Sequence, residues 1–205
     1  MANNSPGGPQ PVMHTAEAPN PIADPAPLGL AGFGTTTLML SFINAGIIAG
    51  TGIGAVLGMA AAYGGTAQFL AGMWAFKRGN TFAATAFSSF GAFWWSFYLI
   101  EVVFAKSLGT AAGPILGLYL ATWGLFTLYM FIASLHGTRA VQVVFFLLTL
   151  TFLFLAIGAW DWFTAGTTLS HIGGYLGIAT AVAALYTSFA DVLNATAKRV
   201  ILPTN

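Results

Sequence analysis

The 205-residue chain contains no cysteine and few charged residues: Lys and Arg together number 6, and Asp and Glu number 5. Without cysteine it can form no disulfide, no thiolate metal site and no thiol nucleophile. Only 5% of its residues are charged and 57% are hydrophobic, whereas soluble domains carry about a quarter of charged residues. This composition is typical of a chain that lies in a lipid bilayer.

Motifs of catalysis and cofactor binding are also absent. There is no Walker-type phosphate loop, so we do not expect ATP-driven pumping by this chain alone. The three histidines, His14, His136 and His171, show no i, i+4 pairing for a metal ion. An intramembrane enzyme would need His, Asp, Glu or Ser groups gathered at one depth, and the sequence offers no such cluster. We therefore predict no enzyme activity, no catalytic residue, no cofactor, no metal site and no nucleic-acid partner.

Long apolar stretches occupy most of the chain. A bilayer core about 30 Å thick needs roughly 20 apolar residues of helix, and only helices or closed barrels satisfy their own backbone hydrogen bonds there. Six stretches qualify, with ends placed to within a few residues: 28–49, 53–75, 82–104, 111–134, 141–163 and 171–193. The sequence predicts an all-α membrane protein with a six-transmembrane-helix bundle in each subunit.

The chain ends differ from this apolar region. Residues 1–27 hold seven of the nine prolines and no basic residue, which is typical of a disordered tail. Residues 28–193 are predicted to form the transmembrane domain, and 194–205 a short second tail. Short cytoplasmic loops retain Lys and Arg, and a cytoplasmic N-terminus puts five basic residues inside and one outside. We therefore predict a multi-pass protein of the cell (plasma or inner) membrane with both termini cytoplasmic. The inside set is Lys77, Arg78, Arg139, Lys198 and Arg199, and the outside residue is Lys106.

Glycine is abundant, with 25 residues. Two runs at four-residue spacing predict helix contact faces, within or between subunits, because small residues let helices approach closely in lipid. These runs are Gly50, Gly54 and Gly58 in the second stretch, and Gly173 and Gly177 in the sixth. Three more glycines crowd the opening turns of the first stretch, where we expect loosened backbone that could offer amide groups to a ligand. They are Gly29, Gly32 and Gly34.

An ionisable group inside a membrane is a candidate for function, but the sequence places none at the midplane. Asp161 and Asp191 lie at predicted helix ends, where an interfacial group can reach water. Glu101 lies about one turn from the outer end of the third stretch, so a proton-linked role and an interfacial role both stay open. Glu101 is therefore the one possible proton-linked residue.

Neutral polar side chains remain inside the predicted bundle. Such groups donate hydrogen bonds without a permanent charge, and weak multiple sites suit a small solute that must enter and leave quickly. A single Ser or Thr often bonds its own helix backbone instead. The candidates for a substrate pathway are Thr36, Thr37, Asn44, Gln68, Ser89 and Thr127, together with the aromatic Trp123.

Ordered sequence blocks resemble the acetate uptake transporter family, which includes the bacterial succinate-acetate permease and the fungal ammonia or acetate transporters. The family hallmark, similar to Asn-Pro-Ala-Pro-Leu-Gly-Leu, is present here from Asp24 to Leu30 and departs only at its first residue. The resemblance extends to about Pro203. Later blocks include Tyr63-Gly64-Gly65-Thr66-Ala67-Gln68, Gly79-Asn80-Thr81-Phe82, Gly91-Ala92-Phe93-Trp94, Trp123-Gly124, Phe145-Phe146 and Val192-Leu193-Asn194.

The resemblance implies a homohexamer in which every subunit has its own pore for acetate and related short carboxylates, with succinate accepted by some members. It implies a narrow apolar ring formed by Phe33, Phe90 and Leu148, where the relatives carry Tyr at the middle position. It also places hallmark residues on the substrate pathway, namely Asp24, Pro25, Leu28, Gly29 and Leu30. An Asp before Pro can start a turn as well as Asn does, but its charge would lie near the inner mouth of an anion path.

These observations predict a membrane channel or secondary transporter for acetate and related short carboxylates. A channel for ammonia or another small neutral solute is the alternative, because the same apolar ring would tolerate it. A membrane scaffold or sensor that transports nothing also stays open. A carboxylate that enters a low dielectric needs either hydrogen-bond donors or protonation, and the sequence does not separate passive anion flow from proton symport.

Overall fold

The computed structural model describes residues 22–161 and 166–205, and every regular element within these two ranges is a helix. Five helical stretches among the described residues are long and apolar enough to cross a membrane: Ala26–Asn44, Gly50–Lys77, Thr81–Ser134, Arg139–Ala159 and Gly166–Ala197. The predicted all-α membrane fold is therefore confirmed. The 54-residue stretch Thr81–Ser134 contains two of the six predicted spans.

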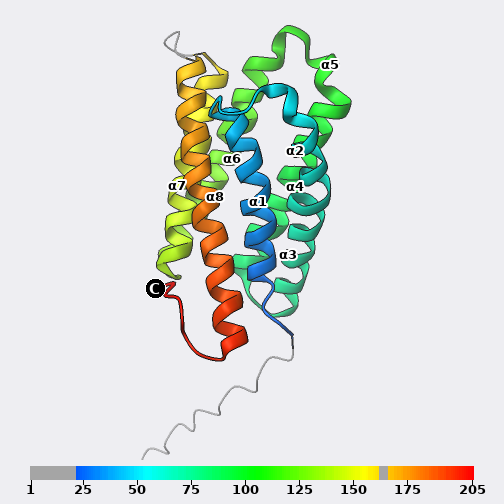
Figure 1. Cartoon of the computed structure of the whole chain (residues 1–205). Helices are drawn as coiled ribbons and strands as arrows, with labels where there is room; N and C mark the ends of the chain where they lie inside the picture. Colours follow the sequence, from blue (N-terminus) through cyan, green and yellow to red (C-terminus); the bar gives the residue numbers. More distant parts are fainter. Residues whose placement is uncertain (1–21, 162–165) are drawn as a thin grey trace, which may run out of the picture.

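Three of the five stretches are single helices, and two are composite (Figure 1). The single helices are α1 (Ala26–Asn44), α7 (Arg139–Ala159) and α8 (Gly166–Ala197). The stretch Gly50–Lys77 consists of η1 (Gly50–Gly52), α2 (Ile53–Met59), the π-helix η2 (Ala60–Ala67) and α3 (Gln68–Lys77). The stretch Thr81–Ser134 consists of α4 (Thr81–Leu99), the π-helix η3 (Ile100–Phe104), α5 (Ala105–Leu108), η4 (Gly109–Ala111) and α6 (Ala112–Ser134).

The ends of α1 differ from the predicted span 28–49. The helix begins at Ala26, because the Asp24 carboxylate accepts a hydrogen bond from the Ala26 amide at 3.0 Å and so forms the turn that starts it. It ends at Asn44, because Gly46 takes a φ of 72°, a left-handed conformation that terminates helices and favours glycine. At the other end of the chain, α8 continues past residue 193 to Ala197.

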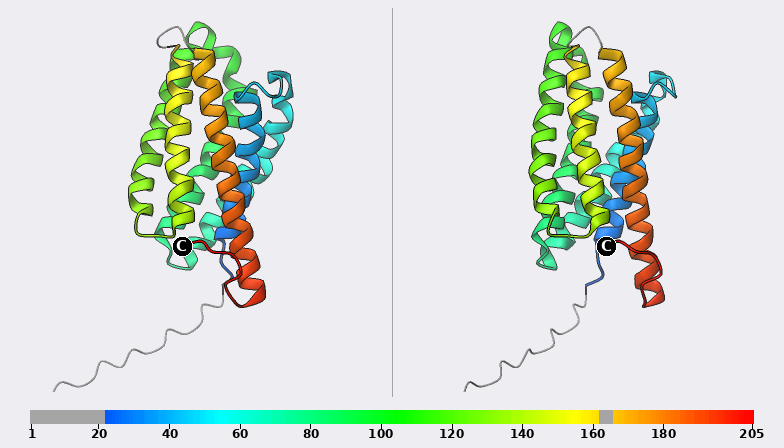
Figure 2. Two further views of the ribbon diagram at one scale, coloured as in Figure 1. Left: turned by 60° about the vertical axis from the view of Figure 1, so that its left-hand side comes forward. Right: turned by 90° about the vertical axis from the view of Figure 1, so that its left-hand side faces the viewer.

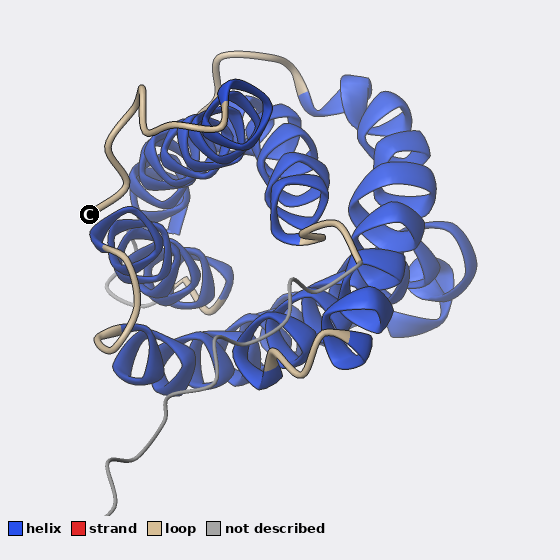
Figure 3. Cartoon of the chain, turned by 90° about the horizontal axis from the view of Figure 1, so that it is seen from below, coloured by secondary structure: helices blue, strands red, loops and turns tan. Residues whose placement is uncertain are grey.

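The helices form a closed ring when the molecule is seen along its long axis (Figure 3). Going round the ring, α8 contacts α1, α1 contacts η2 and α3, α3 contacts α4, α4 contacts α6, α6 contacts α7, and α7 contacts α8. The outside of the ring is apolar, with exposed side chains such as Leu70, Trp74, Leu125, Val182 and Phe189. A surface of this kind is suited to lipid rather than to water.

Both described chain ends lie at one end of the bundle, where α1 begins and α8 ends (Figure 1). We call this the proximal end, and the opposite end the distal end. α8 reaches beyond the other helices at the proximal end (Figure 2). The Asn194 carboxamide there accepts from the amides of Ile201 and Leu202 and donates to the Leu202 carbonyl, at 2.7, 3.0 and 2.8 Å. The segment after α8 is thus held against the bundle.

The glycines divide into packed and open positions. Leu155 lies 2.7 Å from where a Cβ on Gly173 would be, and a Cβ on Gly174 would meet the backbone of Asn44 and Ala45, so this face of α8 is a helix contact as predicted. By contrast, nothing lies within 4 Å of a Cβ built on Gly50, Gly54 or Gly58, so that run makes no close contact within the described subunit.

The expectation of loosened backbone at the start of α1 is wrong. Residues 26–44 form one regular α-helix, and the Gly29 amide donates to the Pro25 carbonyl at 3.0 Å. The three early glycines serve close packing instead. A Cβ on Gly29 would lie 2.5 Å from the Phe87 ring, one on Gly32 would lie 2.9 Å from the Tyr63 carbonyl oxygen, and one on Gly34 would lie 2.9 Å from Leu185.

Candidate transport pathway

Three cavities follow one another through the ring of helices. The distal cavity has a volume of about 230 Å³, the central cavity about 20 Å³ and the proximal cavity about 360 Å³. Phe33 and Leu148 line both the distal and the central cavity. Leu30, Ala86, Phe87 and Phe145 line both the central and the proximal cavity. The shared walls place the smallest space between the two larger ones.

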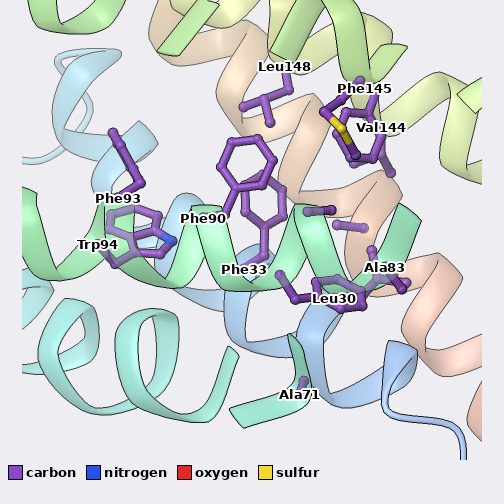
Figure 4. Close-up of a cluster of buried hydrophobic side chains, with 14 of the residues drawn as sticks. Leu30, Phe33, Ala71, Ala83, Phe90, Phe93, Trp94, Val144, Phe145 and Leu148 are labelled. Atoms are coloured by element: carbon purple, nitrogen blue, oxygen red, sulfur yellow. The ribbon is translucent and has the colours of Figure 1, made fainter. Parts of the chain in front are cut away.

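The predicted ring residues come together at the central cavity. Phe33 of α1, Phe90 of α4 and Leu148 of α7 are 5%, 3% and 3% exposed, and all three line this cavity. Their side chains lie next to one another in Figure 4, and the Phe33 and Phe90 ring centroids are 5.7 Å apart. The Phe90 ring also contacts Phe126 and Phe145, at centroid distances of 5.3 and 6.1 Å.

Among the described residues that line the central cavity, Gln68 is the one polar residue. It is 1% exposed, and its Oε1 has no hydrogen-bond partner in the described part of the chain. It is the first residue of α3 and directly follows the π-helix η2. A wider π turn shifts the following side chains around the helix axis, and π-helices recur at functional sites. An unsatisfied buried acceptor costs about 1–3 kcal/mol, a cost that a hydrogen bond from a passing solute would offset.

The distal cavity is neutral, with polar groups set among aromatic rings. Thr37 and Trp94 both line it, and within the described residues neither the Thr37 hydroxyl nor the Trp94 indole N–H has a hydrogen-bond partner. Tyr119 and Asn44 line the same cavity. The Tyr119 hydroxyl lies 2.7 Å from the Ser96 hydroxyl. The distal cavity therefore offers hydrogen-bonding groups that the protein leaves unused.

The proximal cavity carries titratable side chains, namely His136 and Asp191. Two other polar side chains of this cavity cap helices: the Asn80 Oδ1 accepts from the Ala83 amide at 2.9 Å, and the Thr138 hydroxyl accepts from the Val141 amide at 3.5 Å. A third, the Ser134 hydroxyl, donates to the Phe131 carbonyl at 2.6 Å. Asp191 also lines a wider hollow of about 810 Å³ at the proximal end, together with Asp24 and Leu28. The two spaces thus share a carboxylate.

Asp24 has two structural partners at the mouth of this hollow. One carboxylate oxygen accepts from the Ala26 amide, and the other lies 3.9 Å from Nη2 of Arg78. The Arg78 guanidinium also donates to the Ile22 carbonyl. The predicted turn role of Asp24 is therefore present in the structure, and a cation lies beside its negative charge. Its neighbour Pro25 is buried.

Several other predicted pathway residues do not line the three cavities. The Thr36 and Thr127 hydroxyls donate to the carbonyls of Gly32 and Trp123, at 2.8 and 2.7 Å, and so bond their own helices. Trp123 packs against the Phe90 and Phe93 rings, at centroid distances of 6.0 and 5.2 Å. Ser89 and Glu101 are half-buried, Glu101 within η3, and neither is part of a cavity wall.

Some cavity residues were not proposed from the sequence. Phe87, Trp94, Phe145, Thr151 and Asp191 line the cavities. Trp94 and Phe145 fall in blocks that resemble the family, so the signal for them was available. Thr151 carries no local signal, because only the packing of α7 turns it inward. Asp191 carries the signal of an ionisable group, but its position near a predicted helix end favours an interfacial role.

Helices long enough to cross a membrane enclose a line of three cavities. Polar atoms of Thr37, Gln68 and Trp94 along this line have no hydrogen-bond partner among the described residues. These features together define a helical membrane transport protein. Residues 6–205 match the GPR1/FUN34/yaaH family, and the chain belongs to this family. Its members include transporters and channels rather than enzymes, which confirms the prediction that the chain is a membrane transport protein and not an enzyme.

Named relatives extend this result. The succinate-acetate/proton symporter SatP of Escherichia coli K12 is 43% identical over 185 residues, which cover 89% of this chain and 95% of that protein. The acetate permease A of Emericella nidulans is 35% identical over 95% of this chain and 70% of its own length. The ammonia transport outward protein 2 of Saccharomyces cerevisiae is 39% identical over 88% of this chain and 66% of that protein.

The solved structure of the bacterial acetate channel SatP superposes with a TM-score of 0.83 at 42% identity, covering 90% of this chain and 99% of that one. The similarity in structure therefore covers about as large a share of this chain as the similarity in sequence does.

Proposed function

We propose that this chain carries acetate and related short carboxylates, succinate among them, across the membrane through the line of cavities in each subunit. The observation that carries the proposal is the apolar central cavity between two larger cavities that contain hydrogen-bonding groups. Acetate has a methyl group that can face Phe33 and Leu148, and oxygens that can accept from Thr37 and Trp94. The names of the bacterial and fungal relatives support the same substrate class.

Phe33, Phe90 and Leu148 are proposed as the narrowest part of this pore. The proposal is supported by the small volume of the cavity that they line, about 20 Å³, and by their burial. A hydrophobic constriction excludes water and ions unless it opens or the solute is partly apolar. Acetate meets that condition through its methyl group.

Six crossings with both termini in the cytoplasm are proposed for the topology. A 54-residue helical stretch at about 1.5 Å per residue is more than twice as long as a bilayer core is thick. It contains a positive φ of 51° at Gly109, and beyond it α6 packs back on α4. Five of the six basic residues lie beside helix ends or chain ends of the proximal half. The proximal end is therefore assigned to the cytoplasm.

A homohexamer is proposed, with the open glycine face of η1 and α2 at a subunit contact. Gly50, Gly54 and Gly58 have free space over their Cα atoms, and small residues favour close helix approach in lipid. Replacing Gly54 with Leu should change the stability of the single subunit by about 0.5 kcal/mol or less and should shift the particle mass in mild detergent. A mass that corresponds to one subunit in the unsubstituted protein, with full flux, would refute the hexamer.

Ammonia is the weaker candidate for the permeant solute, although one fungal relative is named for it. A carboxylate brings two acceptor oxygens into the distal cavity, where an indole N–H and a hydroxyl have no partner among the described residues. Ammonia has a single lone pair for these donors. The test is flux of labelled acetate into liposomes that contain the purified chain, with protein-free liposomes as background. Uptake of labelled methylammonium without uptake of acetate would favour the alternative.

A further inference from the structure

We propose that Gln68 makes the central cavity selective for the protonated, neutral form of the acid, so that the proton crosses on the substrate itself. This inference rests on the proposed function, because it names the form of the substrate that passes the constriction. It assigns a specificity role to one amide side chain and requires no titratable group in the protein at that depth.

The geometry isolates Gln68 among apolar side chains. The other residues that line the central cavity are Leu30, Phe33, Ala86, Phe87, Phe90, Val144, Phe145 and Leu148. At about 20 Å³ the cavity has room for about one water-sized probe, so a solute must shed its water to pass. Among the described lining residues, Gln68 is the one side chain that can form a hydrogen bond with a solute in the central cavity.

The chemistry of the amide separates the two forms of the acid. A primary amide carries a carbonyl acceptor and an N–H donor, whereas a carboxylate can only accept hydrogen bonds. The Gln68 Oε1 has no donor among the described residues, and a carboxylate oxygen placed beside it would add repulsion. A carboxylic acid supplies an O–H for that oxygen and a carbonyl for the amide N–H. Sites built to bond a hydroxyl reject analogues that lack it by large factors.

The lack of positive charge along the described walls of the three cavities also favours the neutral form of the acid. None of the described residues that line the central cavity is titratable. The titratable side chains that face the neighbouring spaces are Tyr119 in the distal cavity, and His136 and Asp191 in the proximal cavity. Within residues 22–161 and 166–205, no Lys or Arg lines any of these three spaces. An anion would therefore cross the dry section without a counter-charge, which is heavily penalised.

The inference also accounts for the two names that the bacterial relatives carry. One is called a succinate-acetate/proton symporter and the other an acetate channel. A pore that passes only the neutral acid moves one proton with each acetate, as a symporter does, although it needs no proton-carrying residue. It runs down the gradient of the acid, as a channel does.

The test measures initial uptake of labelled acetate by liposomes that contain the purified full chain, at constant total acetate from pH 5 to 7, after subtraction of protein-free liposomes. The acid's pKa should lie near the value of about 4.3 for a Glu side chain, so flux should fall about tenfold for each pH unit. Flux should not respond to a potassium–valinomycin potential, and unlabelled methanesulfonate, a similar anion that stays ionised, should not compete.

The variants are Gln68→Met, which keeps length and removes both hydrogen-bonding groups, and Gln142→Met as the matched control. Gln142 donates its amide to the Gly137 carbonyl at 3.1 Å and is not one of the residues that line the central cavity. Gln68→Met should lower uptake at pH 5 about tenfold or more, in line with the loss of a built hydrogen-bonding site. Gln142→Met should leave uptake within about twofold, because it removes one weak exposed bond.

The outcomes separate the two proposals. No acetate uptake above background in the unsubstituted protein overturns the proposed function. Uptake that is constant from pH 5 to 7, or that an imposed potential changes, overturns the role of Gln68 and leaves acetate transport standing. Equal uptake by both Met variants does the same. If Gln68→Met fails to elute as a folded particle, the pH and potential measurements on the unsubstituted chain decide the matter.

Discussion

Polar groups at the proximal end of the bundle and polar groups in the distal cavity have different partners. At the proximal end, polar bonds join segments that are far apart in the chain: Ser188 donates to the Pro27 carbonyl, Tyr186 to the Pro203 carbonyl, and Arg78 to the Ile22 carbonyl. The distal cavity is lined mainly by aromatic and aliphatic side chains, and the polar groups of Thr37 and Trp94 in it have no hydrogen-bond partner among the described residues. The proximal side chains therefore fix the backbone, whereas these two groups of the distal cavity can bind a solute.

Truncating Phe90, which lies between the distal and proximal cavities, should have the largest effect on stability and flux. The Phe90 ring contacts Phe33, Trp123, Phe126 and Phe145. Phe90→Ala should lower the free energy of unfolding by about 3–5 kcal/mol, the usual cost of truncating a buried Phe. In protein that still folds, the joined cavities should admit larger monocarboxylates, so the ratio of butyrate flux to acetate flux should rise.

The flux ratio separates a constriction from an ordinary packed core. A residue that only fills space would lose stability on truncation without changing size selection. If Ala variants at Phe33, Phe90 and Leu148 all retain the original butyrate-to-acetate ratio, the proposed constriction is in the wrong place. Phe90→Leu provides a milder variant of the same kind if the Ala variant is too unstable to purify.

Removing the hydrogen bonds of Asn194 at the proximal end should have the second largest effect on stability. Asn194 makes three hydrogen bonds to Ile201 and Leu202, each worth about 1 kcal/mol. Asn194→Ala should therefore lower the free energy of unfolding by about 2–3 kcal/mol. It should also make the chain after α8 sensitive to protease added to detergent-solubilised protein. Unchanged protease resistance would mean that Tyr186 and the contact between Thr204 and Ala140 hold the segment without it.

Much of this fold follows from the sequence, for physical reasons. A bilayer requires about 20 apolar residues per helical span, and the apolar stretches contain little else, so the helix positions are largely fixed by composition. The predicted end of the first span, residue 49, is wrong because one residue decides where α1 ends. Gly46 takes a positive φ and stops the helix, although the apolar run continues to Ile48. A hydropathy profile does not detect a helix end that is set by the backbone conformation of one glycine.

The candidate site was less accessible to sequence reasoning. Phe33, Phe90 and Leu148 were named because ordered motifs carried them over from a resembling family, and all three line the central cavity. Thr36 and Thr37 are adjacent and chemically identical, so the sequence pattern does not separate their roles. The Thr36 hydroxyl bonds its own helix, whereas Thr37 lines the distal cavity and its hydroxyl has no partner among the described residues. The difference arises from the rotation of α1 against its neighbours.

A substitution at the distal cavity should sharpen the contrast with Asn194. Thr37→Val replaces an unpaired buried hydroxyl with a methyl group of the same shape, which is close to neutral or stabilising. We expect the free energy of unfolding to rise by up to about 1 kcal/mol, while acetate flux falls because a hydrogen-bonding group is lost from the path. Thr36→Val is the matched control and should leave flux unchanged. A fall in stability of the Thr37 variant would show that its hydroxyl has a structural partner.

The smallest effect is expected at Asp24, which stands where the resembling family carries Asn. Asp24→Asn keeps the side-chain oxygen that accepts from the Ala26 amide and removes only the charge that faces Arg78 at 3.9 Å. Because the Asp24 side chain is 57% exposed, this ion pair contributes about 0–1 kcal/mol. We therefore expect a change in unfolding free energy near 0.5 kcal/mol or less and acetate flux within about twofold of the original. Asp24→Ala also removes the turn and should cost about 1 kcal/mol more. A large gain in flux for Asp24→Asn alone would mean that the negative charge repels the substrate at the proximal mouth and that Arg78 does not offset it.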